Sequence, residues 1–247
     1  GTVNKLSYYT FYNYKTGNGF RPNSYFDSKN IYSFISYNIS PKFSISFELT
    51  YMDYLAQQAG GLTDEMFEDN MLQSKRERNW FHVNWLLYNF KVSYDLDDNT
   101  HMSLSAHMLD AHRYAVGFRT NRVGMDDLNT ERDLIRSNFN NISVETKILH
   151  QYKLFDLNSI FLVGAKFYSG NTLDVQGPGS NGRGAHFDFA TDSYPTYVNQ
   201  SEYLNPNLNC ALFTENIIYL TKKMSLTPGV RFEYIKTSSE GYYYTQN

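Results

Sequence analysis

The chain has 247 residues, a net charge of −3 at neutral pH and a negative mean hydropathy. It has no basic stripe, so nucleic acid is not an expected partner, and it has no run of about 18 apolar residues that would predict a transmembrane helix. The 22 Tyr and 18 Phe residues suit the aromatic girdles of a membrane barrel, but also a Tyr-rich soluble β-sandwich. The single cysteine, Cys210, excludes an internal disulfide.

The first three predicted strands cover Lys5–Thr16, Asn30–Ile39 and Phe43–Tyr51. The third alternates most clearly, with apolar residues at its odd positions and Ser, Glu or Thr between them. Because neighbouring residues of a strand point to opposite faces, one face of this strand is apolar and the other hydrophilic. Burying Glu48 in a dry sandwich core would be costly, whereas a water-filled lumen accepts it.

Two longer strands are predicted next, over Trp80–Leu96 and Thr100–Phe118. In the first, the apolar set changes phase near Trp85–Leu87, from Phe81 and Val83 to the even positions that follow. This change predicts either a β-bulge or a strand that continues above the membrane.

The remaining strands lie around Ile142–Ile148 and over Ser159–Ser169, Leu208–Leu220 and Met224–Tyr234. The last places Arg231 and Glu233 on its hydrophilic side. Pro228 has no N–H to donate to a ladder, so we expect it at a bulge or near a strand start.

The connections between these strands alternate between short and long. The short ones are Ser40–Lys42, Asp95–Asn99, Lys153–Asn158 and Thr221–Lys223, and the long ones are Gly17–Ser28, Leu55–Arg78, Arg119–Asn140 and Gly170–Pro206. A soluble sandwich has no reason to keep its long loops at one end, whereas a transmembrane barrel has short periplasmic turns and longer extracellular loops.

The sequence therefore predicts an all-β fold: an antiparallel up-and-down segment of a transmembrane β-barrel with about nine strands. Single-chain bacterial barrels normally close with an even number of strands, and an open edge is not tolerated in hydrocarbon. We therefore expect residues 1–247 to be part of a larger barrel. Because no signal peptide precedes the first strand, we expect a mature form or an excised piece.

Three local motifs are weak functional signals. Gly177–Gly182 matches a dinucleotide fingerprint, but it lies in a predicted loop with no helix after it, so turn chemistry explains it better. The six histidines are scattered, and a metal site is less expected than interfacial or lumen-facing imidazoles. Leu62–Asp69 is predicted to be a short surface helix capped by Thr63 rather than a calcium loop. No catalytic constellation is apparent, and we expect no enzyme activity.

Arginines are concentrated in the predicted extracellular loops. Arg76 and Arg78 lie where a long loop re-enters the barrel, and five others belong to such loops, namely Arg21, Arg119, Arg122, Arg132 and Arg136. Guanidinium groups at a barrel mouth suit carboxylate-rich ligands. Ordinary salt bridges with Asp126, Asp127, Glu131 and Asp133 are an equally good interpretation.

The chain resembles the barrel of TonB-dependent outer-membrane receptors, most closely those of the ferric-dicitrate type. The likeness spans nearly the whole chain. The matching stretches are Phe11–Lys15 with Gly19–Ser24, Tyr54–Thr63, Arg76–Phe81, Arg132–Ile135, Phe161–Gly164 and Leu226–Tyr234. The stretches Tyr54–Thr63 and Arg76–Phe81 are fairly specific, while the last is common among such receptors.

The resemblance implies a barrel of about 22 strands closed by an N-terminal plug. It also implies active uptake of a ferric chelate across the Gram-negative outer membrane, with no cofactor beyond that transported ligand. The driving partner would be the TonB–ExbB–ExbD energy-coupling complex, which would act through the plug. We expect the plug and the closing strands to lie outside residues 1–247. The candidate ligand-binding residues are Arg76, Arg78, Arg21, Gln57, Gln58 and Arg122. A glycan or peptide importer, a non-transporting barrel such as an adhesin, and a soluble carbohydrate-binding sandwich are the alternatives.

Overall fold

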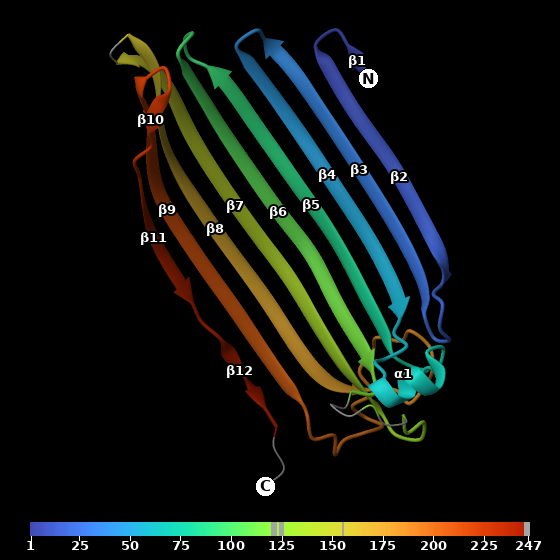
Figure 1. Ribbon diagram of the computed structural model, residues 1–247. Coiled ribbons are helices and arrows are strands. Elements are labelled where there is room, and N and C mark those ends of the chain that lie inside the picture. Colours follow the sequence, from blue (N-terminus) through green and yellow to red (C-terminus); the bar gives the residue numbers. More distant parts are fainter. Residues whose placement is uncertain (120–122, 124–125, 155, 245–247) are drawn as a thin grey trace.

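The computed structural model describes residues 1–119, 123, 126–154 and 156–244. Its strands form one 12-stranded antiparallel sheet in which β1 to β10 follow each other in chain order, while β11 and β12 also pair with β9 (Figure 1). The long strands are β2 (Leu6–Asn18), β3 (Tyr25–Ser40), β4 (Phe43–Gln57), β5 (Trp80–Asp95), β6 (Thr100–Gly117), β7 (Arg132–Leu154), β8 (Leu157–Gly179) and β9 (Ser201–Thr221). The short elements are β1 (Thr2–Val3), α1 (Asp64–Asn70), β10 (Met224–Leu226), β11 (Gly229–Thr237) and β12 (Glu240–Tyr243).

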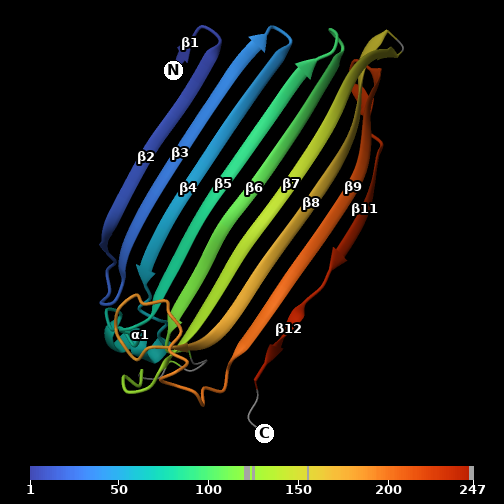
Figure 2. The ribbon, with the colours of Figure 1, turned by 180° about the vertical axis from the view of Figure 1, so that it is seen from behind.

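The predicted all-β, up-and-down architecture is confirmed. Tight turns join the strands at one end of the sheet, and the long connections, including α1, gather at the other (Figures 1 and 2). Within the described residues the sheet stays open, because β1 and β2 form one edge and β10 to β12 form the other, with no pairing between the two. None of the described helices is long and apolar enough to cross a membrane.

The strands near the loops are longer than the alternation predicts. Pairing between β7 and β8 runs without a break from Leu154↔Leu157 to Arg132↔Gly179, and β9 begins at Ser201. The predicted loops Arg119–Asn140 and Gly170–Pro206 are therefore wrong in their bounds. Arg132 and Arg136 belong to β7 rather than to a loop, and the glycine motif begins in the last residues of β8. Apolar alternation marks only the part of a strand that faces lipid, whereas the hydrogen-bond ladder continues beyond it.

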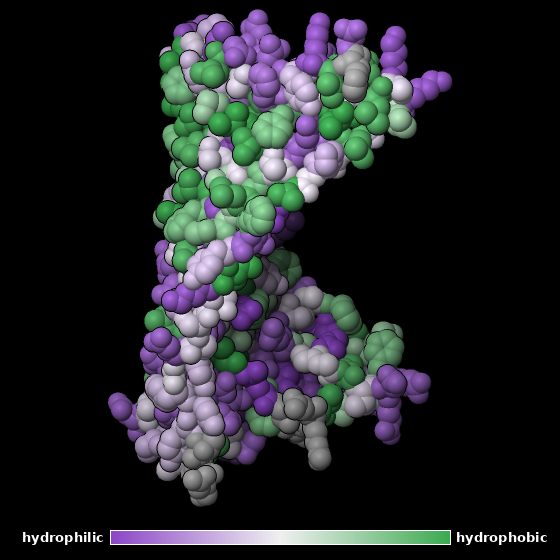
Figure 3. Space-filling model, turned by 90° about the vertical axis from the view of Figure 1, so that its left-hand side faces the viewer, coloured by the Kyte–Doolittle hydropathy of each residue, from purple (hydrophilic) through white to green (hydrophobic). Residues whose placement is uncertain are grey.

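Two neighbouring rows of residues show how the sheet divides its faces. Leu49, Tyr88, Met108 and Ile142 pair across β4 to β7 and form an apolar row, while the next row on the opposite face contains Glu48, Asn89, His107 and Ser143. Hydrophobic residues gather over much of the convex side of the sheet, away from its hollow (Figure 3). The apolar face is therefore the convex outer face, and the hydrophilic face lines the concave, lumen side.

The change of phase in β5 does not come from a bulge. Register is continuous through Trp85–Leu87 against both β4 and β6, so the bulge prediction is wrong. Nearer the loops, the outer face itself becomes polar, with Asp53, Asn84 and His112 aligned across β4 to β6. This agrees with the alternative that β5 continues beyond the lipid, where water meets both faces.

The last predicted strand is broken into segments. β10, β11 and β12 all pair with β9 and together take the place of one strand. Pro228 lies between β10 and β11, directly before a strand start, as its missing N–H predicts. Few apolar side chains are buried among the described residues, and Val116 and Leu134 lie at the loop end of the sheet. Because packed side chains restrain the chain there, this end of the sheet can hold a binding site in a fixed geometry.

Candidate functional site

The connection between β4 and β5 carries the predicted surface helix. Thr63 caps α1 by accepting a hydrogen bond from the backbone N–H of Met66 at 3.2 Å, and Asp64 and Glu65 occupy the first turn. A side-chain cap and acidic residues at the start of a helix both satisfy its N-terminal N–H groups. The helix therefore gives this long connection a fixed shape ahead of its return to the sheet.

Arg76 and Arg78 point to different sides of the sheet. Gln58 donates its backbone N–H to the carbonyl of Asn79 at 2.8 Å, which extends the β4–β5 ladder beyond the strands. In this extended segment, residues two apart from Trp80 share its outer face, whereas Asn79 points to the lumen side. Arg78 accordingly meets the outer side of the rim. The chain bends at residues 77 and 78, and Arg76, before this bend, lines a cavity on the lumen side instead.

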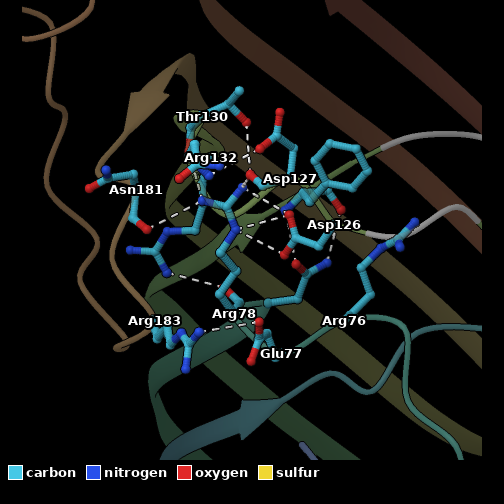
Figure 4. Close-up of polar contacts among 12 residues, drawn as sticks. Arg76, Glu77, Arg78, Asp126, Asp127, Thr130, Arg132, Asn181 and Arg183 are labelled. Carbon is cyan, nitrogen blue, oxygen red and sulfur yellow. Dashed lines mark hydrogen bonds and ion pairs between the residues drawn. The ribbon is translucent and has the colours of Figure 1, made fainter.

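Arg78 is completely buried and fully engaged by loop groups. Its guanidinium pairs with Asp126, with Nε 2.9 Å from Oδ2 and Nη2 2.8 Å from Oδ1. Nη1 donates to the carbonyl oxygens of Thr130 at 2.7 Å and Asn181 at 3.3 Å, and Nη2 donates to that of Asp127 (Figure 4). Salt bridging within the loops, the alternative interpretation of these arginines, describes Arg78.

Arg132 completes this cluster from the first position of β7. It is also fully buried, and it donates to the carbonyl oxygens of Ser180 at 2.8 Å, Gly184 at 2.8 Å and Arg78 at 3.1 Å. We call Arg78, Arg132 and Asp126 the arginine cluster. It ties together the connections that follow β4, β6 and β8, because each supplies a side chain or a carbonyl group to it.

A polar cavity of about 700 Å³ opens on the lumen side of the same loops. Gln58, Arg76, Asn79, Asp133 and Gln176 contribute to its lining, together with Gly60, Gly61, Phe118, Arg119, Val123 and Asn199. Arg76 lies with its guanidinium carbon 5.1 Å from the centre of the Phe118 ring, and the Asn79 amide donates to the Phe118 carbonyl oxygen at 3.1 Å. We call this space the lumen-side cavity. Its lining is mainly polar, with carboxamides, two guanidinium groups and the carboxylate of Asp133 beside the apolar Phe118 and Val123.

The loop backbone beside Arg76 depends on Gly60. Gly60 has a φ of +77°, and a Cβ atom there would lie 2.6 Å from Cγ of Arg76. Only glycine adopts this conformation without strain and leaves room for the arginine. The Arg21 guanidinium donates to the Gly60 carbonyl oxygen, and Gln57 Nε2 donates to the Glu77 carbonyl oxygen at 2.8 Å.

The second half of the 180–200 segment borders the cavity, to which it contributes Asn199. Tyr197 is 6% exposed and donates its hydroxyl to Oδ1 of Asp133, a cavity-lining residue of β7. Burial, followed by this hydrogen bond to a carboxylate, raises the pKa of Tyr197 above its ordinary value. The hydroxyl therefore remains a donor throughout the neutral pH range and holds the segment to β7.

The structure thus separates the predicted ligand-binding residues. Arg76 and Gln58 line the lumen-side cavity, Arg21 and Gln57 brace the loop around it, and Arg78 belongs to the arginine cluster. Arg122 lies outside the described residues. Sequence reasoning did not single out Asn79, Tyr197 or Asn199. Within the part of the chain that the structure describes, no group of three or more His, Cys, Asp or Glu side chains is arranged to hold a metal ion.

The chain matches known proteins in structure, but no match was found by sequence. No protein-family model matches the chain, and no curated protein matches it. It is similar to the crystal structure of the ferric citrate transporter FecA in its unliganded form, with a TM-score of 0.79, 15% identity, and coverage of 97% of this chain and 34% of that one. BauA, the ferric preacinetobactin receptor from Acinetobacter baumannii, matches with a TM-score of 0.68 and 9% identity over 95% of this chain and 37% of that one.

The closed form of the ferric-catecholate import receptor Fiu from E. coli K12 matches with a TM-score of 0.70 and 8% identity, over 97% of this chain and 38% of that one. The chain thus spans little more than a third of the length of these structures. At such low identity the likeness is one of fold. The sheet has the fold of part of an outer-membrane receptor barrel.

Proposed function

We propose that the chain forms part of the barrel of a TonB-dependent outer-membrane receptor that takes up an anionic ferric chelate. The lumen-side cavity is the observation that carries the proposal. It lies among the long loops, on the hydrophilic face of the sheet, and it presents Arg76 and Arg119. Two guanidinium groups beside amides, against the single carboxylate of Asp133, suit a ligand with several carboxylate oxygens.

The fold supports the same proposal. The apolar convex face suits outer-membrane lipid, and the concave face suits a water-filled lumen. The two open edges of the sheet need further strands, because unpaired backbone groups are not tolerated in hydrocarbon. In this proposal those strands and a plug come from other parts of the same receptor, and the plug receives the pull of the TonB–ExbB–ExbD complex. The proposed function requires the receptor to bind the ferric chelate and let it pass, and it requires no covalent chemistry.

Among the predicted ligand residues, we assign direct contact to Arg76 and Gln58, and we add Arg119 to them. All three line the lumen-side cavity. Arg21 and Gln57 would support the ligand site indirectly through the loop backbone. Arg78 would act at a distance by fixing the loops. This division follows from which side of the rim each side chain occupies.

The test uses the full-length receptor and ferric citrate as the probe. Replacing Arg76 and Arg119 together with Ala should weaken binding measured by calorimetry at least about tenfold, because each lost charge-assisted contact is worth roughly 1.5–3 kcal/mol. Arg183→Ala is the matched control, since the Arg183 side chain is 68% exposed and its one ion pair among the described residues is with Glu77 at 3.6 Å. Equal affinity of the double variant and the control would remove the cavity from the proposal.

A glycan importer is the second candidate, because four carboxamides from Gln58, Asn79, Gln176 and Asn199 also line the cavity. Carboxamides donate and accept hydrogen bonds, as sugar hydroxyls require. The two candidates differ in charge dependence. Saturable binding of neutral oligosaccharides that survives the Arg76→Ala and Arg119→Ala substitutions, together with no binding of ferric citrate, would favour the glycan importer.

A further inference from the structure

The first half of the 180–200 segment folds over the outer face of the sheet rather than over the lumen. The Phe187 ring stacks on the His82 ring with centroids 5.6 Å apart and lies 6.0 Å from the Tyr114 ring. Phe189 lies under the guanidinium of Arg136 at 5.7 Å, and the Trp80 indole donates to the Arg183 carbonyl oxygen at 2.7 Å. Outer-face side chains of β5, β6 and β7 therefore hold this segment.

The surface under Phe187 contains a chain of hydrogen bonds between two histidines and a carboxylate. His82 Nε2 lies 3.0 Å from Oδ2 of Asp53, and His82 Nδ1 lies 3.3 Å from Nε2 of His112. Asn84 also donates to Asp53 Oδ2 at 3.0 Å. Because the His112 ring stacks on Tyr114 at 4.4 Å, both imidazoles belong to the aromatic surface that Phe187 covers.

This arrangement accommodates at most one extra proton. When both imidazoles are neutral, His112 donates to His82 and His82 donates to Asp53. With one proton added, His82 donates at both nitrogens, to Asp53 and to His112. With two protons, every ring nitrogen carries hydrogen and none can accept, so the His82–His112 bond is lost and two positive charges face each other.

Partial burial opposes a second positive charge on this pair, and charges of both signs surround it. Asp53 on β4 attracts positive charge, but its carboxylate also interacts with Lys29 on β3. On β6, Asp110 attracts positive charge at His112, while Arg136 on β7 repels it and lies 4.7 Å from the Tyr114 ring. Two imidazolium groups would therefore be crowded beside a guanidinium group.

We propose that His82, His112 and Asp53 form a proton-sensitive latch for the 180–200 segment. The latch is closed while the two imidazoles carry one extra proton or none, and a second proton taken from solvent opens it by breaking the His82–His112 bond and displacing Phe187. The same segment supplies Asn199 to the lumen-side cavity and Tyr197 to Asp133. Acidification outside the cell would thereby loosen a wall of that cavity.

Hydrogen exchange of the full-length protein in lipid nanodiscs tests the latch without any ligand. The reporter is the amide of Ala190, which donates to the Pro178 carbonyl oxygen at 2.8 Å. After correction for intrinsic exchange rates, its protection should fall about tenfold between pH of about 7.5 and 5, across the range in which histidines titrate. Unchanged protection in the unmodified protein would overturn the proposal.

Substitutions identify the groups responsible. His112→Phe retains an aromatic ring beside Tyr114 but cannot be protonated, so its Ala190 protection should not change with pH. His107→Phe, on the lumen side of the same strand, and His186→Phe, beside Phe187, should behave like the unmodified protein. Full pH dependence in His112→Phe, or its loss in His186→Phe, would contradict the assignment. If His112→Phe does not fold, His82→Phe gives the same test.

Discussion

Replacing Arg78 with Ala tests whether the arginine cluster holds the extracellular loops together. Arg78 is completely buried, and its partner Asp126 is only 4% exposed. Removing one member of a buried ion pair costs about 3–5 kcal/mol when the other charge is left alone. Here Arg132 still attracts Asp126 after the substitution, so we expect a cost near the lower end, about 3 kcal/mol. The carbonyl oxygens of Thr130 and Asn181 lose their donor as well. Because the barrel itself does not depend on these contacts, the loss should appear as local opening of the loops.

Hydrogen exchange at the amide of Thr130, which donates to the Asp127 carbonyl oxygen, measures this opening. Protection in Arg78→Ala should fall by about two orders of magnitude or more, since each 1.4 kcal/mol is worth about tenfold. Arg183→Ala is the control, because an exposed pair contributes at most about 1 kcal/mol. The reasoning is refuted if Arg78→Ala and Arg183→Ala reduce protection equally.

Three further predictions concern the cavity and the faces of the sheet. Gly60→Ala should weaken ferric citrate binding severalfold by displacing Arg76, whereas Gly61→Ala, with no neighbour within 4 Å of its added Cβ, should leave binding unchanged in calorimetry. Tyr197→Phe should lower the local stability of the 180–200 segment, measured by hydrogen exchange, by about 1–3 kcal/mol. Since the pKa of Tyr197 is raised on folding, this contribution should be constant below the ordinary tyrosine pKa and vanish only as the pH rises through the raised value; a loss near neutral pH would contradict it. Leu104→Arg, on the apolar face, should lower the unfolding free energy in lipid by about 2–4 kcal/mol, while Ser105→Arg on the lumen face should be nearly neutral; equal effects would show that the faces are wrongly assigned.

Sequence pattern predicted the parts of the fold that lipid dictates. Alternation around Glu48 and the turn at Ser40–Lys42 gave the strand and its register, because one face meets hydrocarbon and the other water. The same signal fails above the lipid, where both faces are wet. There β7 and β8 extend well past the parts that alternate. The residues of these extensions were therefore predicted to be loops.

The candidate site could be predicted only in part. Arginine content pointed to the loop end, but the sequence did not predict that Arg76 and Arg78 separate, because residues two apart would share a face in an extended strand. The contact of His82 with His112 follows from cross-strand register, because the pairs His82↔Tyr114 and Asn84↔His112 make the two histidines diagonal neighbours on one face. Pairing β5 with β6 through the Asp95–Asn99 turn would have found it. Contacts such as Tyr197 with Asp133 join segments that no local pattern connects.

Spin labels at two neighbouring positions of β7 test most directly which face meets lipid. In a Cys210→Ser background, a label at Ile142→Cys should collide readily with lipid-dissolved oxygen and poorly with a water-soluble nickel complex. A label at Ser143→Cys should show the opposite preference, because its side chain points into the lumen. Equal exposure of both labels to the nickel complex, or a reversed pattern, would contradict a barrel wall with lipid outside and a ligand path within.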